Sequence, residues 1–213
     1  MFYFFGFPNQ TNILFTKMKE LRKKNLNTPE LANELFEKRW RKQLHYIDWL
    51  RFKKLVQYYQ GGRYLDIGCF NTPIMLELKR DFPNEEFYGL DHADKVINYL
   101  QKQFPDINYV LGDVMKLPFE NEFFNYVVMG ELIEHMESPA ELLKEAFRVL
   151  KRGGMLALST PDSEEIHNPL VSEEHLWAFT EEDIKELLGI YGKVEVIKFK
   201  DTVNNLIAFV QKV

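Results

Sequence analysis

The chain has almost no cysteine and no long apolar run, and each shortage excludes a class of protein. Cys69 is the single cysteine among 213 residues, so no disulfide can form within the chain, which favours a reducing, cytoplasmic compartment. No stretch approaches the ~20 apolar residues of a membrane span, so we expect no membrane association. Residues 1–7 are apolar but too short for a secretory signal, and we expect them to pack on the domain or to form an oligomer contact.

Acidic residues outnumber basic ones over most of the chain, and the net charge is −5. Residues 1–62 hold 12 lysines and arginines against 5 acids, a net of +7, whereas residues 63–213 hold 15 against 27, a net of −12. Two interpretations stay open. The basic arm could pack on the acidic body, or it could bind an anionic substrate such as a nucleic acid or a phosphorylated metabolite.

Apolar residues, by contrast, are plentiful: they form 46% of the chain, and 15% of all residues are aromatic. This composition predicts a packed core, and the length suits one α/β domain with a helical extension. Apolar residues recur at helical spacing over 11–24 and 29–60, the second helix beginning at Thr28-Pro29, with room for a break near Tyr46. Gly61-Gly62 is the strongest boundary. It separates a helical arm or lid, 1–62, from a second domain, 63–213.

Strand and helix patterns alternate from residue 63 onward. The predicted strands are 63–68, 86–91, 107–112, 123–130, 154–160, 192–200 and 204–212. The predicted helices are 73–82, 93–104, 138–151 and 180–189. This alternation is typical of an α/β fold with a mostly parallel sheet covered by helices, and the last two strands can pair as a hairpin.

Four of these strands end in a glycine or an acid. The terminal residues are Gly68, Asp91, Gly112-Asp113 and Gly130-Glu131. In open α/β sheets, ligands bind in the crevice outside the carboxyl ends of the strands, at the point where strand order reverses. The pattern therefore predicts a site for a nucleoside-containing ligand.

Six short motifs, in this order over roughly 100 residues, carry a family resemblance. They are Leu65-Asp66-Ile67-Gly68-Cys69, Gly89-Leu90-Asp91, Gly112-Asp113-Val114 with Leu117-Pro118-Phe119, Gly130-Glu131-Leu132-Ile133-Glu134-His135, Phe147-Arg148-Val149-Leu150-Lys151-Arg152-Gly153-Gly154 and Ser159-Thr160-Pro161. Residues 40–213 thereby resemble the class I S-adenosylmethionine-dependent methyltransferases, in the broad group that includes many small-molecule O-methyltransferases. The resemblance implies a Rossmann-like sheet of seven strands, mostly parallel with the last antiparallel, helices on both faces, and S-adenosylmethionine as cofactor.

The resemblance also implies how the first strand and its turn meet the cofactor. Asp66 would lie under the turn, near the methionine ammonium group. Gly68 would let the backbone approach the cofactor, with Cys69 and Phe70 completing the turn. The family usually has further glycines where this chain has Phe70 and Thr72. The turn could shift outward, the ring could pack on the methionine tail, or binding could be lost.

Residues at the ends of the later strands would recognise the nucleoside part of the cofactor. Asp91 would accept hydrogen bonds from both ribose hydroxyls, and His92 would lie along the adenine edge. Asp113 would accept from the adenine amino group while Val114 packs on the ring. Gly130 would also contact the cofactor, and Glu131, at the end of the fourth strand, would lie beside the methyl-transfer position. A further departure, Asn125 in place of the usual aspartate, is expected to be structural.

Two carboxylates and a histidine follow the fourth strand at helical spacing. Offsets of three and four would place Glu131, Glu134 and His135 on one face of a helix. With His175 as a fourth ligand, the set resembles the metal site of small-RNA 2′-O-methyltransferases. The same pattern occurs in metal-independent relatives, where His135 would be a base or a scaffold residue. A bound metal is therefore an alternative to a metal-free site.

The resemblance implies methyl transfer to a small-molecule acceptor, for which we expect an oxygen atom. His135 is the first candidate for taking the acceptor's proton, and Glu131 is the second. Two alternatives remain. One is a metal-assisted RNA ribose 2′-O-methyltransferase whose basic arm holds the phosphates. The other is a non-catalytic, methyltransferase-like scaffold subunit that no longer binds the cofactor.

Overall fold

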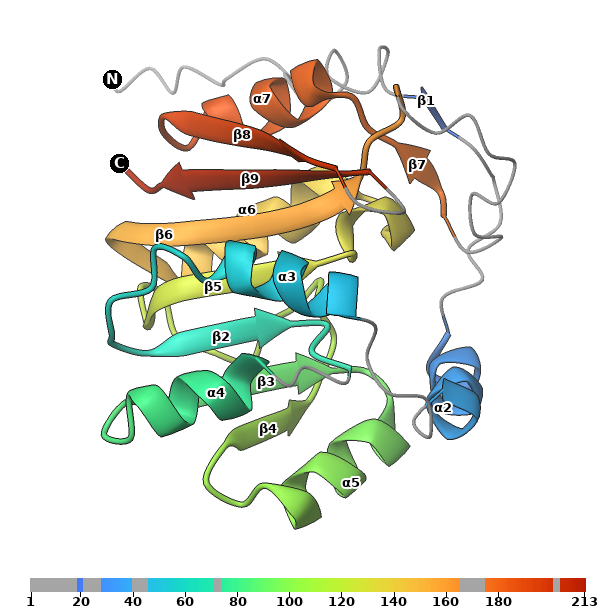
Figure 1. Ribbon diagram of the computed structural model, residues 1–213, viewed down its shortest axis with the longest axis vertical. Helices are drawn as coiled ribbons and strands as arrows, with labels where there is room; N and C mark the ends of the chain where they lie inside the picture. The colour runs from blue at the N-terminus through green and yellow to red at the C-terminus, as the bar shows by residue number, and fades with distance from the viewer. Residues whose placement is uncertain (1–18, 21–27, 40–45, 71–73, 165–174, 201–203) are drawn as a thin grey trace, which may run out of the picture.

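A seven-stranded sheet forms the body of the molecule in the computed structural model, which describes residues 19–20, 28–39, 46–70, 74–164, 175–200 and 204–213 (Figure 1). Its order is β4-β3-β2-β5-β6-β9-β8. The strands are β2 (Tyr64–Ile67), β3 (Phe87–Asp91), β4 (Asn108–Leu111), β5 (Phe124–Gly130), β6 (Leu150–Pro161), β8 (Val194–Phe199) and β9 (Asn205–Gln211). Only β9 runs antiparallel to its neighbours, which confirms the predicted sheet and its terminal hairpin.

Strand order reverses between β2 and β5. From β2 the chain moves outward through β3 to β4, and it then returns to place β5 on the other side of β2. The parallel strands all point toward the same edge of the sheet, on the right in Figure 1. The crevice predicted for a ligand therefore lies at the carboxyl ends of β2 and β5.

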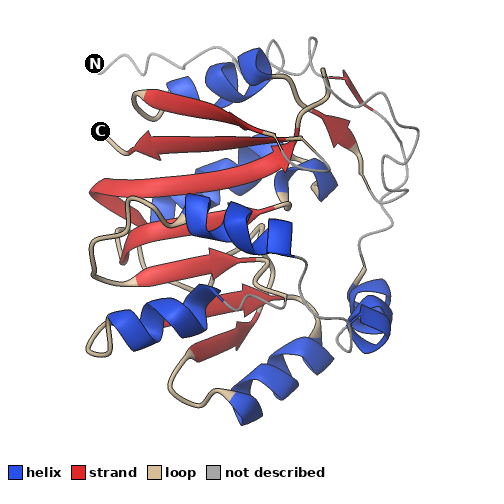
Figure 2. Cartoon of the chain, viewed as in Figure 1, coloured by secondary structure: helices blue, strands red, loops and turns tan. Residues whose placement is uncertain are grey.

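Helices cover both faces of the sheet (Figure 2). One face carries α3 (Tyr46–Leu55), α4 (Ile74–Asp81) and α5 (Asp94–Gln103), and the other carries α6 (Pro139–Val149) and α7 (Glu181–Gly189). From Tyr126 to Met129, successive β5 residues alternate between the two cores, because side chains along a strand point to opposite faces. No helix in the described part of the chain has the length and apolar character needed to cross a bilayer.

The predicted helix over 29–60 is in fact two helices, α2 (Pro29–Arg39) and α3, and α3 begins at the expected break near Tyr46. The second helix ends at Leu55, five residues early. The hydroxyl of buried Tyr126 donates to the Leu55 carbonyl (2.7 Å), and Tyr59 turns into an aromatic cluster with Tyr64. Tertiary contacts thus replace the last helical turns. The division of the chain at residue 62 stays a prediction.

Two further sequence predictions were wrong in part. Lys19–Glu20 is a short strand, β1, paired antiparallel with β7 (Trp177–Ala178), whereas a helix was predicted over 11–24; the rest of that range lies outside the described residues. The helix predicted to run to residue 151 ends at Val149, because Leu150 already pairs with Phe124 as the start of β6. The sheet's pairing prevails over local helix propensity at this junction.

Gly62 is held against Asn125, as expected for a structural role of that asparagine. Gly62 has φ +88, and a Cβ there would lie 2.5 Å from Asn125 Cγ. The same side chain accepts hydrogen bonds from Arg63 N (3.1 Å) and Lys151 Nζ (3.0 Å). Any side chain at residue 62 would push Asn125 off both donors.

We therefore expect Gly62→Ala to lower the free energy of unfolding by about 3 kcal/mol, from overpacking and lost hydrogen bonds. Gly153→Ala is the matched control. Gly153 also has positive φ (+74) but no atom within 4 Å of its Cβ position, so only backbone strain of about 1 kcal/mol is expected. Urea denaturation measures both, and equal losses would contradict this account.

Candidate active site

The turn after β2 folds back onto the end of β3. The backbone N–H groups of Gly68 and Cys69 both donate to the Leu90 carbonyl, at 2.8 and 3.0 Å. Gly68 has φ +72, and a Cβ there would lie 3.0 Å from Leu132 Cδ1. The positive φ therefore favours glycine, and any side chain at this position would also require Leu132 to shift.

The carboxylate of Asp91 closes this turn. Its Oδ2 accepts from Phe70 N (3.0 Å), and its Oδ1 accepts from Ala93 N (2.9 Å). Asp91 is only 6% exposed. Each carboxylate oxygen has a second lone pair, so both can still accept a further hydrogen bond.

Phe70 forms the turn without a glycine. It adopts the left-handed conformation, φ +33, and its ring packs partly against the core beneath α4 and α5. The hydrogen bond to Asp91 compensates for the backbone strain. Phenylalanine in place of the family's usual glycine is thus compatible with a closed turn. Thr72 lies outside the described residues.

Two predicted cofactor residues at this turn are buried. Asp66 is 3% exposed and Cys69 is 1% exposed. The Cys69 sulfur packs so closely on β3 that a Cβ at Gly89 would lie 2.9 Å from it. Burial and the nearby carboxylates of Asp66 and Asp91 raise the pKa of the Cys69 thiol. Cys69 therefore contributes its backbone to the turn, and its side chain belongs to the core.

Helix α2 docks beside the end of β3. The Asn33 side chain accepts from Lys95 N (3.1 Å) and donates to Asp94 Oδ1 (2.7 Å), at the first turn of α5. His92, half-buried, lies in the short link between these contacts and Asp91. Asn33 thus caps a helix whose own N-cap residue, Ala93, cannot. No local sequence pattern indicates this contact, because it joins distant segments.

The end of β4 presents one exposed acid and one core residue. Asp113 is exposed, and its Oδ1 accepts from Met115 N (2.8 Å). Val114 is 7% exposed and belongs to the core under α6 and α7. The Asp113 carboxylate is the more accessible of the two acids predicted to read the nucleoside.

Helix α3 lies across the end of β5. A Cβ at Gly130 would lie 3.4 Å from Phe52 and 3.6 Å from Leu55, which are ordinary contact distances and show how closely α3 packs on this strand end. The next residue, Glu131, has φ +53 and donates its N–H to the Ser159 carbonyl (3.0 Å). Its Oε1 accepts from Ser159 Oγ (2.8 Å), and its Oε2 lies 3.4 Å from Arg51 Nη1.

The expected helical face after β5 is absent from the structure. Only a single 3₁₀ turn, η1 (Ile133–His135), follows, and the left-handed Glu131 comes before it. Glu131 therefore points to Arg51 and Ser159 and does not join the ligand set that contains Glu134. The prediction that all three share one helix face was wrong. Arg51 was missed, because its partner lies far along the chain.

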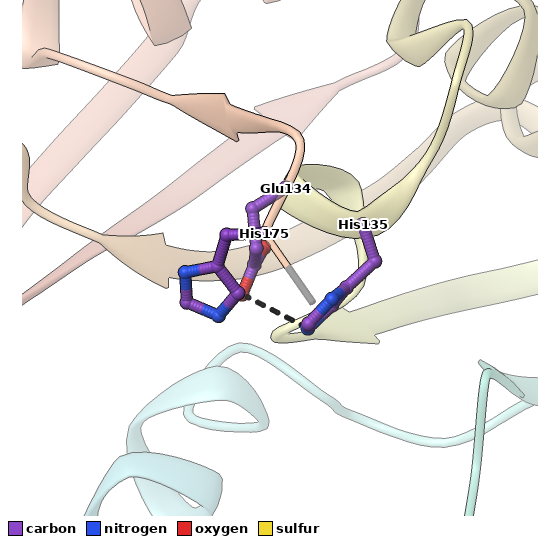
Figure 3. A group of neighbouring side chains, drawn as sticks. All are labelled: Glu134, His135 and His175. Atoms are coloured by element: carbon purple, nitrogen blue, oxygen red, sulfur yellow. Dashed lines mark ion pairs between the residues drawn. The ribbon is translucent and has the colours of Figure 1, made fainter. Parts of the chain in front are cut away.

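Glu134, His135 and His175 converge at the end of η1 (Figure 3). One ligand atom from each lies within 4.8 Å of the others. His135 Nε2 is 3.9 Å from Glu134 Oε1, and the two imidazole rings meet edge to face with centroids 4.7 Å apart. Leu176 N donates to the Glu134 carbonyl (2.8 Å), which fixes the segment that carries His175.

Burial dominates the electrostatics of this cluster. Burial first, and then the charge of Glu131, raise the pKa of Glu134, whose Oε2 accepts from Thr160 Oγ1 (3.0 Å). Burial and the neighbouring His135 lower the pKa of His175 to about 4. His175 is therefore a neutral imidazole near pH 7.

The chain is similar in sequence to known methyltransferases. Residues 65–158 match the family model described as "Methyltransferase domain". A demethylmenaquinone methyltransferase from Lysinibacillus sphaericus is 28% identical over 146 residues, which cover 66% of this chain and 59% of that protein. The biotin biosynthesis bifunctional protein BioHC from Teredinibacter turnerae is 32% identical over 111 residues, 47% of this chain and 20% of that protein. The chain thus spans less than two thirds of the length of either relative.

Solved structures share the fold. An S-adenosylmethionine-dependent methyltransferase from Aquifex aeolicus superposes with a TM-score of 0.65 at 18% identity, covering 88% of this chain and all (100%) of that one. The plantazolicin methyltransferase BpumL, solved with S-adenosylhomocysteine, gives 0.70 at 15% identity over 86% of this chain and 95% of its own. Residues 65–158 are therefore similar in sequence to a methyltransferase domain, and the described part of the chain has the fold of these solved methyltransferases.

Since both oxygens of Asp91 accept from backbone N–H groups, an amide cannot replace its carboxylate. We expect Asp91→Asn to lower the free energy of unfolding by about 2 kcal/mol, because the new NH₂ faces an N–H donor. Asp106→Asn, in the exposed loop before β4, should change it by less than about 0.5 kcal/mol. Chemical denaturation measures both, and an unaffected Asp91→Asn would rule out the proposed role of this carboxylate.

Proposed function

We propose that this protein transfers a methyl group from S-adenosylmethionine to an oxygen atom of a small-molecule acceptor. The observation that carries the proposal is the Asp91 carboxylate, which holds the turn after β2 closed at the point where strand order reverses. The match to a methyltransferase domain over residues 65–158 supports the same conclusion.

The cofactor would lie along the ends of β2, β3 and β4. The free lone pairs of Asp91 would accept from the ribose hydroxyls, with His92 at the adenine edge. Exposed Asp113 would accept from the adenine amino group, beside Val114. Gly68 and the backbone of Cys69 and Phe70 would face the methionine part, above buried Asp66.

The acceptor would bind beyond Gly130, between η1 and the start of β7. The sulfonium carries the reactive methyl, so the protein needs chiefly to align acceptor and methyl. The methyl–sulfur bond breaks as the methyl–oxygen bond forms, S-adenosylhomocysteine leaves, and the hydroxyl proton passes to the protein. His135 is our first candidate for that proton and Glu131 the second.

The relatives' names support a small molecule as acceptor. They include demethylmenaquinone methyltransferases, a biotin biosynthesis protein and, at 29% identity over 115 residues, a ubiquinone/menaquinone biosynthesis C-methyltransferase from Desulfotalea psychrophila. The last acts on carbon by its name, so the choice of oxygen rests on the proton-accepting groups beside Gly130. Residues 1–7, behind the oligomer prediction, and six of the twelve basic residues behind the nucleic-acid prediction lie outside the described residues.

Calorimetric titration with S-adenosylhomocysteine tests the proposal. We expect micromolar binding by the wild-type chain. Asp113→Ala should weaken it at least tenfold, which is about 1.4 kcal/mol for one lost hydrogen bond to a charged group. Asp113 makes only a local hydrogen bond to Met115 N, so this variant should fold normally. Asp91→Ala should abolish binding, and Asp106→Ala is the matched control.

The wild-type result decides between an enzyme and a scaffold. Absence of binding by a folded wild-type protein would mean that the Phe70 turn excludes the cofactor. The non-catalytic scaffold would then replace the enzyme. Equal binding by wild-type protein and Asp113→Ala would contradict the assigned adenine contact but leave the cofactor site in place.

A further inference from the structure

One buried oxygen of Glu134 lacks a hydrogen-bond partner. Glu134 is 1% exposed, and its Oε1 has no hydrogen-bond donor among the described residues, although its Oε2 accepts from Thr160. A buried carboxyl oxygen without a hydrogen bond is costly, and proteins offset that cost by protonation, by a donor or by a cation. The Oε1 atom is therefore available to a cation.

Two imidazoles face the same oxygen. His135 approaches it from η1 and His175 from the segment before β7, and all three ligand atoms lie within 4.8 Å of one another (Figure 3). In a tetrahedral site with bonds of about 2.1 Å, ligand atoms lie about 3.4 Å apart. Small side-chain rotations would therefore bring the three onto one ion.

We propose that Glu134, His135 and His175 bind one divalent transition-metal ion. Two imidazole nitrogens and one carboxylate oxygen, with a position left open, are the ligand set of catalytic zinc sites. Mg²⁺ prefers oxygen ligands alone, so this set disfavours it. The ligands number three and not the four expected from sequence, because Glu131 is held by Ser159 and Arg51.

The inference rests on the proposed function and changes how the acceptor is activated. An imidazole whose nitrogen binds the ion does not accept a proton from the acceptor. The open position of the ion would instead bind the acceptor's oxygen and lower the pKa of its hydroxyl. The hydroxyl proton then passes to the carboxylate of Glu131, our second candidate.

Calorimetric titration of the chelator-treated full chain with Zn²⁺ tests this inference without a known acceptor. We expect saturable binding of one ion, and no comparable binding of Mg²⁺ at the same concentration. Glu134→Gln and His175→Ala should each weaken Zn²⁺ binding at least tenfold. Even the loss of a residue that only hydrogen-bonds to a metal ligand lowers metal affinity by about 10–100-fold.

Matched controls separate the site from general affinity for zinc. Glu137→Gln and Glu141→Gln each remove an exposed carboxylate outside the cluster; both should bind Zn²⁺ as the wild type does. Thermal melting shows that each variant is folded. Wild-type protein without saturable binding, or Glu134→Gln and His175→Ala that both bind like the controls, would overturn the inference.

Titration of the same samples with S-adenosylhomocysteine separates this inference from the proposed function. Cofactor binding without zinc binding would overturn the metal site and leave methyl transfer standing. Zinc binding without cofactor binding would support the metal site and contradict the methyltransferase proposal.

Discussion

The hydrogen bonds that the Asp91 carboxylate accepts hold together the strand ends at which the cofactor is proposed to bind. It joins the turn after β2 to the link before α5, because it accepts from Phe70 N and from Ala93 N at once. The Leu90 carbonyl reinforces the same junction by accepting from Gly68 N and Cys69 N. Two neighbouring strand ends are thereby fixed where strand order reverses, and α2 docks beside them through Asn33.

The other end of the site depends on two carboxylates in different surroundings. Glu131 is partly exposed and lies against the Arg51 guanidinium and the Ser159 hydroxyl. Glu134 is buried, and burial together with the charge of Glu131 raises its pKa. Environments that separate two acids in this way also give them different roles. Under the proposed metal binding, Glu134 holds the ion and Glu131 takes the proton; in a metal-free site His135 is the first candidate for that proton.

The sequence was sufficient for the features that local pattern encodes. Strand ends at Gly68, Asp91 and Asp113 were predictable, because an apolar run followed by glycine or an acid is a local signal. The hairpin of β8 and β9 was also predictable from the local pattern. The joining of His175 to Glu134 and His135 was anticipated only from a family resemblance, since no local pattern specifies it.

The features that failed are set by contacts between distant segments. Lys19–Glu20 is a strand because it pairs with β7, and Leu150 begins β6 because it pairs with Phe124. Local propensity favoured a helix in both places. Glu131 leaves the expected helical face because its left-handed backbone directs it to Arg51 and Ser159. Arg51 itself gave no signal, because one arginine on an amphipathic helix resembles any other.

A crystal structure of the protein with S-adenosylhomocysteine would test the central claim most directly. The account predicts both ribose hydroxyls within hydrogen-bond distance of Asp91, with the hydrogen bond from Phe70 N to Asp91 retained. A ribose bound elsewhere, or a turn that must open and break this hydrogen bond to admit the ligand, would contradict it.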